Sequence, residues 1–512
     1  MASDEKEVMS ANEKEVDTFT DVVGADTVEL LSSERNTKWN RLKGVIWDSL
    51  DKSPEERRFI FKVDCWVMTY VCVSYFVKYL DSMNTANAYV SGMKEDLNFH
   101  GIQYNWLSTW YYIGYIIGQV PSQIAISYIR PSIWLPANEI LYAAFVMAMA
   151  GAKDVKTLYA FRFFIGLFES TAYVGIMTLL SNFYLPDELG KRTCIFQTSS
   201  SAAQMFSGYL QTGLYNGMNG NGGLAAWRWL FIFDGVITIP VAIAGFFVIP
   251  DDPLDSKAFW FKANDKKIAL ERLKKSNRNT KPKMKFNHLL DMLKDWPIYL
   301  FSAAFCCHVV GIRLYSYMNL WLQEAGFSVS KTNILPTVGY AIQIVCTLCW
   351  AWLSDGFGSR WSVIVLACST AIIGSIILWV WPNKNSGLFA GWYLLFCETG
   401  AGALFIAWMS ETLSTAVEQR YLIIGVVETT SFILSAAVPL YLYPADEAPH
   451  YRYAYPVTFM FFTLEAVLTI VIAYIQRLEN KGILVNKHFF EDVVDKNISA
   501  VEEAEVIEKT MA

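Results

Sequence analysis

The stretch 158-LYAFRFFIGLFESTAYVGIMTLL-180 places an arginine and a glutamate inside an otherwise apolar run. A helix of about 20 apolar residues crosses the ~30 Å hydrocarbon core of a bilayer, so this run is long enough to span a membrane. The whole chain of 512 residues is 54% hydrophobic and only 18% charged, whereas soluble proteins average about 25% charged residues. The surplus of apolar surface therefore predicts a membrane protein.

Twelve apolar runs of spanning length follow one another along the chain. They lie near residues 60–80, 104–126, 132–150, 157–180, 193–215, 228–249, 297–322, 333–353, 361–381, 387–410, 421–443 and 456–476. The pattern predicts an all-α membrane protein with twelve transmembrane helices, arranged as two six-helix halves.

The polar segments between and around these runs divide the chain into five parts. We expect an N-terminal tail at 1–59, a first half at 60–249, a linker at 250–296, a second half at 297–478 and a C-terminal tail at 479–512. The linker has twelve Lys and Arg against seven Asp and Glu from Pro250 to Asp295, which predicts a cytoplasmic position by the positive-inside rule. An even number of spans on each side then makes both tails cytoplasmic.

Arg162 and Glu169 belong to one polar face of their span, because Arg162, Gly166, Glu169 and Tyr173 are spaced at i, i+4, i+7 and i+11. Charged groups inside a membrane are costly and normally face a cavity or a partner. An arginine stays protonated, whereas a buried glutamate can take up and release a proton. We expect Arg162 to bind an anion and Glu169 to carry the coupling proton; a permanent tie between helices is the alternative.

Two further spans carry polar faces. Gln197, Gln204 and Gln211 recur every seven residues on span five and either line a pathway or join helices. On span seven, Arg313 and Tyr317 form a cationic and aromatic face suited to a carboxylate on an organic body. His308 on the same span is either a titrating group or a hydrogen-bonded packing residue.

The segment 351-AWLSDGFGSRWSV-363 holds Asp355, Gly358 and Arg360 in a short connection between spans eight and nine. Glycine permits a sharp reversal, and the two charges can pair with helix ends and hold one closed state. It resembles the signature loop of the major facilitator superfamily, and we expect Asp355 and Arg360 to act in gating. The corresponding first-half loop retains only Arg130.

Three stretches together resemble the fungal allantoate, pantothenate and biotin permease group, which belongs to the anion:cation symporter family of that superfamily. They are YLDSMNTANAYVSGMKEDL at 79–97, RFFIGLFES at 162–170 and MFSGYLQTGLYNGMNGNGGLAAWRWLFIFDGVITIPVAIAGFF at 205–247. The resemblance implies carboxylate binding by Arg162 and Arg313 and proton coupling by Glu169. Many relatives have an arginine after the span-one aspartate, where Ser82 stands here; Lys78, one turn earlier, can replace that charge.

These observations predict proton-coupled uptake (symport) of a small organic anion, with the vitamin pantothenate as the first candidate. Biotin, a sulfonate or other sulfur-containing acid, allantoate and nicotinate are alternatives, and a non-transporting membrane receptor is the alternative of a different class. We expect no enzyme activity, no cofactor and no nucleic-acid partner. We also expect no metal site, because the nine cysteines lie mostly in apolar runs without metal-ligand spacing. The expected partners are the organic acid, protons and the lipid bilayer. We expect the protein to be a monomer in the plasma membrane. The substrate-site candidates are Arg162, Arg313, Lys78, Tyr317, Gln197 and Gln204.

Overall fold

The computed structural model describes residues 52–251, 256, 258–275, 296–412, 417–451 and 453–481. Every regular element in this part of the chain is a helix. The first half contains α2 (Pro54–Val63), η1 (Asp64–Met68), α3 (Thr69–Ala88), η2 (Tyr89–Met93), α4 (Lys94–Asp96), α5 (Gln103–Tyr128), α6 (Pro131–Met149), α7 (Val155–Glu169), α8 (Thr171–Phe183), α9 (Pro186–Met218), η3 (Asn221–Gly223) and α10 (Ala226–Val248). The linker contributes α11 (Ala263–Lys275).

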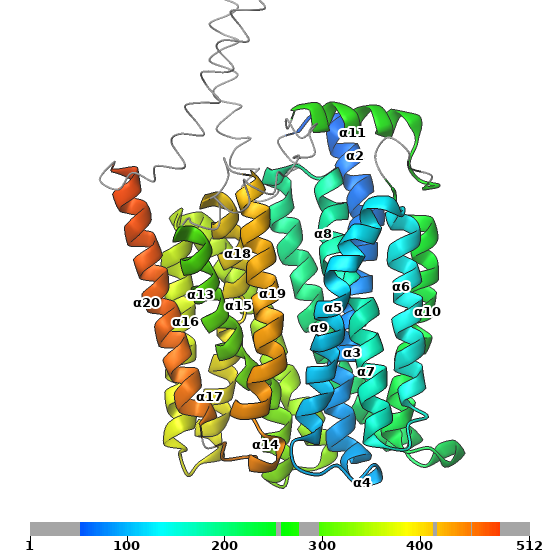
Figure 1. The fold of residues 1–512 in the computed structure, drawn as a ribbon, viewed down its shortest axis with the longest axis vertical. Coiled ribbons are helices and arrows are strands. Elements are labelled where there is room, and N and C mark those ends of the chain that lie inside the picture. The colour runs from blue at the N-terminus through cyan, green and yellow to red at the C-terminus, as the bar shows by residue number, and fades with distance from the viewer. Residues whose placement is uncertain are drawn as a thin grey trace, which may run out of the picture.

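The second half follows the same plan. It contains α13 (Trp296–Ile312), η4 (Arg313–Tyr317), α14 (Met318–Glu324), α15 (Val329–Phe357), α16 (Arg360–Val380), α17 (Asn385–Glu398), α18 (Ala401–Thr412), α19 (Val417–Leu442), η5 (Ala445–Glu447) and α20 (Ala454–Asn480). The two halves form bundles that lie side by side, with their helices roughly parallel to the long axis (Figure 1). The predicted all-α architecture of two six-helix halves is thus confirmed.

Each of the twelve predicted spans coincides with one helix or with an interrupted pair of helices. Among the described residues, 10 helical runs are long and apolar enough to cross a membrane. The remaining two positions belong to α5 and α9, which have 26 and 33 residues and are rich in Gln, Ser and Tyr. Their polar content makes them less hydrophobic than the other ten, and their length and position in the bundle agree with the spans predicted at 104–126 and 193–215.

Span one is longer than its hydropathy predicts. The helical run continues from Pro54 to Asp96, whereas the apolar run ends near residue 80. Polar residues beyond that point remain in the bundle because they bond to other helices; Asn84, for example, donates to Asp234 at 2.8 Å. Lys78 and Asp81 therefore lie within the span rather than near its end.

The linker helix α11 lies across one end of the first half (Figure 1). Lys62 on α2 pairs with Asp265, and Arg272 on α11 pairs with Glu56 at 2.7 Å and with Glu188 at the start of α9. This part of the linker is docked by ion pairs onto the bundle. The two predicted tails, apart from residues 52–59 and 479–481, lie outside the described residues, as do linker residues 276–295.

Several contacts join the two halves toward the end that carries α4 and α14. The buried Asn105 amide on α5 donates to the backbone oxygens of Pro439 and Tyr443 at 2.9 and 2.7 Å. Asn319 on α14 donates to Asn87 on α3 at 2.8 Å. These buried hydrogen bonds of asparagine side chains hold the halves together at this end.

Helices α5 and α7 cross at backbone contact because glycines stand at the crossing. A Cβ on Gly166 of α7 would lie 2.0 Å from the backbone oxygen of Tyr111, and a Cβ on Gly114 of α5 would lie 2.1 Å from that of Phe163. Gly166 thus admits a neighbouring helix between the two charged residues, as its position in the sequence predicts. The crossing fixes the tyrosines of α5 beside the charges of α7.

We expect Gly166→Ala to lower the melting temperature of the detergent-purified protein, since overpacking a tight contact costs about 1–3 kcal/mol. Gly213→Ala on α9 is the matched control, because a Cβ there meets no atom within 4 Å. A thermal-unfolding assay on both variants checks the prediction. Equal melting temperatures for the two variants would contradict the close α5–α7 crossing.

Candidate functional site

Four charged side chains meet between α3 and α7. Nη1 of Arg162 is 3.1 Å from Oδ2 of Asp81, and Nζ of Lys78 is 4.0 Å from Oε1 of Glu169. Lys78 and Asp81 are three residues apart on α3, and the two α7 partners occur in the opposite order, so the helices are antiparallel and each base faces an acid. All four are at most 7% exposed, hence the group is a buried, alternating set of charges.

The two acid–base pairs differ in how firmly they are held. Arg162 also donates to Thr85 and lies 5.6 Å from the centroid of the Tyr111 ring. Glu169 has the long contact with Lys78 and a contact with the hydroxyl group of Tyr111. The Lys78–Glu169 pair is therefore the more easily exchanged of the two.

A third carboxylate, Asp234 on α10, completes this group, which we call the N-half cluster: Lys78, Asp81, Arg162, Glu169 and Asp234. Its Oδ2 accepts from Asn84, whose Oδ1 in turn accepts from Ser207 at 2.6 Å. Asp234 also interacts electrostatically with Asp81 and Glu169. The cluster thus contains three acids and two bases, one negative charge more than its cations balance.

A cation from the second half approaches the same region. Arg313 in η4 donates to the hydroxyl of Tyr112 on α5 at 2.8 Å and to Ser435 on α19 at 2.6 Å. Lys78 lies 5.0 Å from the ring centroid of Tyr115, which is one turn from Tyr112 on α5. Both rings contact Phe432 of α19, at 6.2 and 4.4 Å between centroids. Lys78 and Arg313 thus flank one aromatic cluster, formed by Tyr112, Tyr115 and Phe432.

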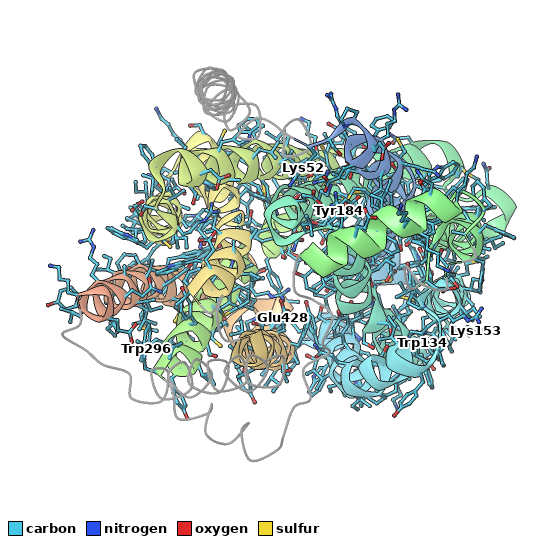
Figure 2. The ribbon with its side chains drawn as sticks, turned by 90° about the horizontal axis from the view of Figure 1, so that it is seen from above. Lys52, Trp134, Lys153, Tyr184, Trp296 and Glu428 are labelled. Atoms are coloured by element: carbon cyan, nitrogen blue, oxygen red, sulfur yellow. The ribbon has the colours of Figure 1, made fainter. Side chains whose placement is uncertain are left out.

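Glu428 is a further member of this region on α19. It interacts electrostatically with Lys78 and lies near the boundary between the two halves when the molecule is viewed from the α11 end (Figure 2). Glu428, Phe432 and Ser435 are spaced at i, i+4 and i+7, which places them on one helical face. That spacing, and the i, i+3 spacing of Tyr112 and Tyr115, are the sequence signals for the aromatic cluster.

The other predicted substrate residues occupy different places. Gln197 accepts from Tyr75 at 3.3 Å and is half-buried, beside the aromatic residues around Lys78. Gln204 donates to the backbone of Ser200 in its own helix at 3.3 Å. Tyr317 accepts from Asn105 at 3.3 Å and stacks on Tyr443, which places it in the contact between the halves.

Asp355 and Arg360, for which the sequence predicts a role in gating, form an ion pair. Nη1 of Arg360 is 2.6 Å from Oδ1 of Asp355, and Nη2 is 2.8 Å from Oε1 of Glu411 on α18. Gly358 ends α15 at φ 60°, the left-handed conformation that glycine adopts without strain. The loop therefore ties α15, α16 and α18 together at the α11 end of the second half.

His308 lies apart from these residues. Its Nδ1 contacts Glu398 on α17 at 2.7 Å and Glu465 on α20 at 3.2 Å. Sequence spacing does not bring the three together, because they come from spans seven, ten and twelve.

Two six-helix halves with ionic groups buried at their centre define a membrane transporter. Residues 71–439 match the Major Facilitator Superfamily, and the chain belongs to this family. It is therefore a transporter rather than an enzyme.

The chain is 33% identical over 410 residues to the MFS transporter PfmaC of Pestalotiopsis fici, covering 79% of this chain and 77% of that protein. It is 30% identical over 404 residues to the pantothenate transporter liz1 of Schizosaccharomyces pombe, covering 77% and 78% respectively. Among solved structures, the proton:xylose symporter XylE bound to 6-bromo-6-deoxy-D-glucose has a similar fold, with a TM-score of 0.62 at 13% identity, covering 79% of this chain and 95% of that one. The relatives place the chain among fungal transporters, and the structural match concerns the fold alone.

We expect Asp81→Asn to destabilise the protein by about 3–5 kcal/mol, because it leaves the Arg162 guanidinium buried without its counter-ion. The double variant Asp81→Asn/Arg162→Gln removes both charges and should recover a large part of that loss. Thermal unfolding of the purified single and double variants measures the difference. A double variant that is less stable than Asp81→Asn would show that the two charges do not compensate one another.

Proposed function

We propose that this transporter catalyses proton-coupled uptake (symport) of a small organic anion, and that the anion is pantothenate. The observation that carries the proposal is the buried pair of Lys78 and Glu169, whose charged atoms lie 4.0 Å apart, beyond hydrogen-bond distance. The relative named as a pantothenate transporter supports the choice of substrate.

Coupling follows from exchange of the negative charge beside Lys78. A proton on Glu169 neutralises its carboxylate and leaves the ammonium group of Lys78 without its closest counter-charge. A substrate carboxylate can then take that place, so the site again has the same net charge. Since an uncompensated ion in the membrane costs several kcal/mol, binding of the anion and binding of the proton favour one another.

The aromatic cluster supplies a surface for the organic body of the substrate. Tyr112 and Tyr115 offer ring faces and hydroxyl groups next to Lys78 and Arg313, and the half-buried Gln197 offers an amide. Pantothenate has one carboxylate, one amide and two hydroxyl groups on a short branched chain. Two cations around tyrosine rings and amide groups match this chemistry.

The direction of access rests on the basic linker. With α11 and the linker on the cytoplasmic side, the buried amide contacts of Asn105 and Asn87 close the extracellular end, and the Asp355–Arg360 loop lies on the cytoplasmic end. The transport cycle then exchanges these contacts as the halves rock about the central site. In this proposal the protein is a monomer of the plasma membrane with both termini in the cytoplasm.

Uptake of radiolabelled pantothenate by yeast cells lacking their own pantothenate transporter tests the substrate. We expect uptake to increase as the medium is acidified and to collapse when a protonophore is added. Excess unlabelled biotin, nicotinate, allantoate or a sulfonate should compete weakly. Absence of pantothenate uptake at normal surface expression would refute the substrate, and uptake unaffected by the protonophore would refute the coupling.

Glu169→Gln should separate binding from coupling, since the amide mimics a protonated carboxyl group. Lys78 then lacks its closest counter-charge at every pH, so exchange of labelled for unlabelled pantothenate should proceed in proteoliposomes with weaker pH dependence than in the wild type. The proton that Glu169 carries is no longer transported, so accumulation under a given pH gradient should fall well below that of the wild type. Exposed Glu55 provides the matched control, and Glu55→Gln should behave as the wild type. A Glu169→Gln protein that accumulates substrate as strongly as the wild type under the same pH gradient would assign this coupling proton to another residue.

A further inference from the structure

A second group of buried titratable side chains lies in the second half, apart from the substrate site. His308 on α13, Glu398 on α17 and Glu465 on α20 form this group, which we call the C-half triad. Nδ1 of the imidazole is 2.7 Å from Oε1 of Glu398 and 3.2 Å from Oε1 of Glu465. The exposed fraction of the three side chains is 0 to 3%.

The charges of the triad do not balance. With the imidazole protonated, one positive charge faces two carboxylates, and a net negative charge remains in the interior of the bundle. Among the described residues, none donates a hydrogen bond to Oε2 of Glu398, and Glu465 contacts the imidazole and the thiol of Cys368, which is a weak donor. Burying an ion without compensation is expensive, so one additional proton is what the triad requires for neutrality.

The neighbouring helices supply no compensating cation among the described residues. Thiol and hydroxyl groups face the two carboxylates, namely Cys368 on α16, Cys307 on α13 and Tyr315 in η4. On α18, a Cβ at Gly402 would lie 2.7 Å from Nε2 of His308. The acids of α18 and α19 whose side chains are described are engaged elsewhere: Glu411 pairs with Arg360, and Glu428 interacts electrostatically with Lys78.

A proton fits this geometry better than a metal ion. A tetrahedral ion with bonds of about 2.0–2.1 Å holds its donor atoms about 3.3 Å apart. Nδ1 of His308 and Oε1 of Glu398 are 2.7 Å apart, the length of a direct charge-assisted hydrogen bond.

The triad occupies the positions that correspond to the N-half cluster. His308 follows Lys78 by 230 residues, Glu398 follows Glu169 by 229, and Glu465 follows Asp234 by 231. These pairs lie on spans one and seven, four and ten, and six and twelve, the spans that the parallel repeat of this superfamily relates to one another. Glu169 and Glu398 are also each the last residue of a helix, α7 and α17, before an interruption of the span.

Both groups also have the same charge excess. The N-half cluster has three acids and two bases, and the triad has two acids and one base. Each of these two groups therefore requires one proton to become neutral.

We propose that the C-half triad is a second proton-binding site, so that each transported anion is accompanied by two protons, one bound in each half. The proposal rests on the proposed symport. The triad joins α13, α17 and α20, and two of these spans are interrupted next to it. Binding of a proton reduces the attraction of the two carboxylates for His308 and thereby changes how firmly these helices are held together.

The charge moved per cycle distinguishes two protons from one. One proton with a monovalent anion is electroneutral, whereas two protons carry one net positive charge inward. Uptake by the wild type should then be driven by a negative interior potential as well as by a pH gradient.

Proteoliposomes with a potassium diffusion potential set by valinomycin measure this charge. We expect an interior negative potential to stimulate uptake of labelled pantothenate several-fold in the wild type and in the control Glu55→Gln. Glu465→Gln leaves one base and one acid in the triad, so its uptake should respond to a pH gradient and no longer to the potential. Glu398→Gln is the second variant, with the same expected outcome. Wild-type uptake that ignores the potential, or a Glu465→Gln protein that keeps the stimulation, would overturn the proposal.

Infrared difference spectroscopy of the purified protein tests the site without any substrate. Acidification should produce carbonyl-stretch intensity of a protonated carboxyl group that is absent from both Glu465→Gln and Glu398→Gln and present in Glu55→Gln. If the wild type shows this band but does not transport pantothenate, the proposed substrate is refuted and the proton site is supported. A spectrum in which neither variant removes a titrating band would refute the proton site, even where symport itself is confirmed.

Discussion

The compensation of charge inside a low-dielectric bundle is the constraint on which the rest of this structure depends. Arg162 and Asp81 neutralise each other at 3.1 Å, and Lys78 and Glu169 face each other at 4.0 Å. A charged side chain at the centre of a span costs roughly 2.5–3.5 kcal/mol on insertion scales, so each of these groups can be retained only with a partner. The partners sit on different helices, and the charge pattern therefore fixes the rotation of α3 relative to α7.

The glycine crossing of α5 and α7 translates this rotation into a binding surface. Backbone contact at Gly114 and Gly166 brings the tyrosines of α5 against the cations of both halves. Lys78 lies 5.0 Å from the centroid of the Tyr115 ring, and the hydroxyl oxygen of Tyr112 accepts a hydrogen bond from Arg313. A bulkier residue at either glycine would move α5 away and separate the aromatic cluster from the charges, so two residues without side chains hold the rings beside the charged groups.

The sequence predicted the fold well, because hydropathy and charge segregation are read locally. Twelve apolar runs and a basic linker are visible without tertiary information, and so is the charged face of span four. Which buried charges pair with each other depends on contacts between helices that are far apart in the sequence, so the sequence alone does not determine it. The distance from Arg162 to Glu169 along one helix shows that they do not form a short pair, but only the packing of α3 shows that Asp81 and Lys78 are their partners. Polar helices were also hard to delimit, since the end of span one and the length of α9 are stabilised by side-chain bonds to other helices rather than by lipid.

The residue that sequence reasoning understood least, His308, shows why the repeat matters. Taken alone, a histidine in an apolar span is as compatible with packing as with titration. Its positional equivalence to Lys78, with Glu398 and Glu465 equivalent to Glu169 and Asp234, gives it the role of the basic member of a buried charge group. Beyond these equivalent residues the two halves differ. The first half also contains the Arg162–Asp81 pair, which is neutral by itself. The second half also contains Arg313, which follows the interruption of span seven and donates a hydrogen bond to Tyr112 of the first half. Arg313 is five residues from His308 on the same span, so under the two proposals a rearrangement of the triad would move η4 and the cation beside the proposed substrate site. The proposed proton site in the second half and the proposed anion site between the halves are thus joined by a single short segment of chain.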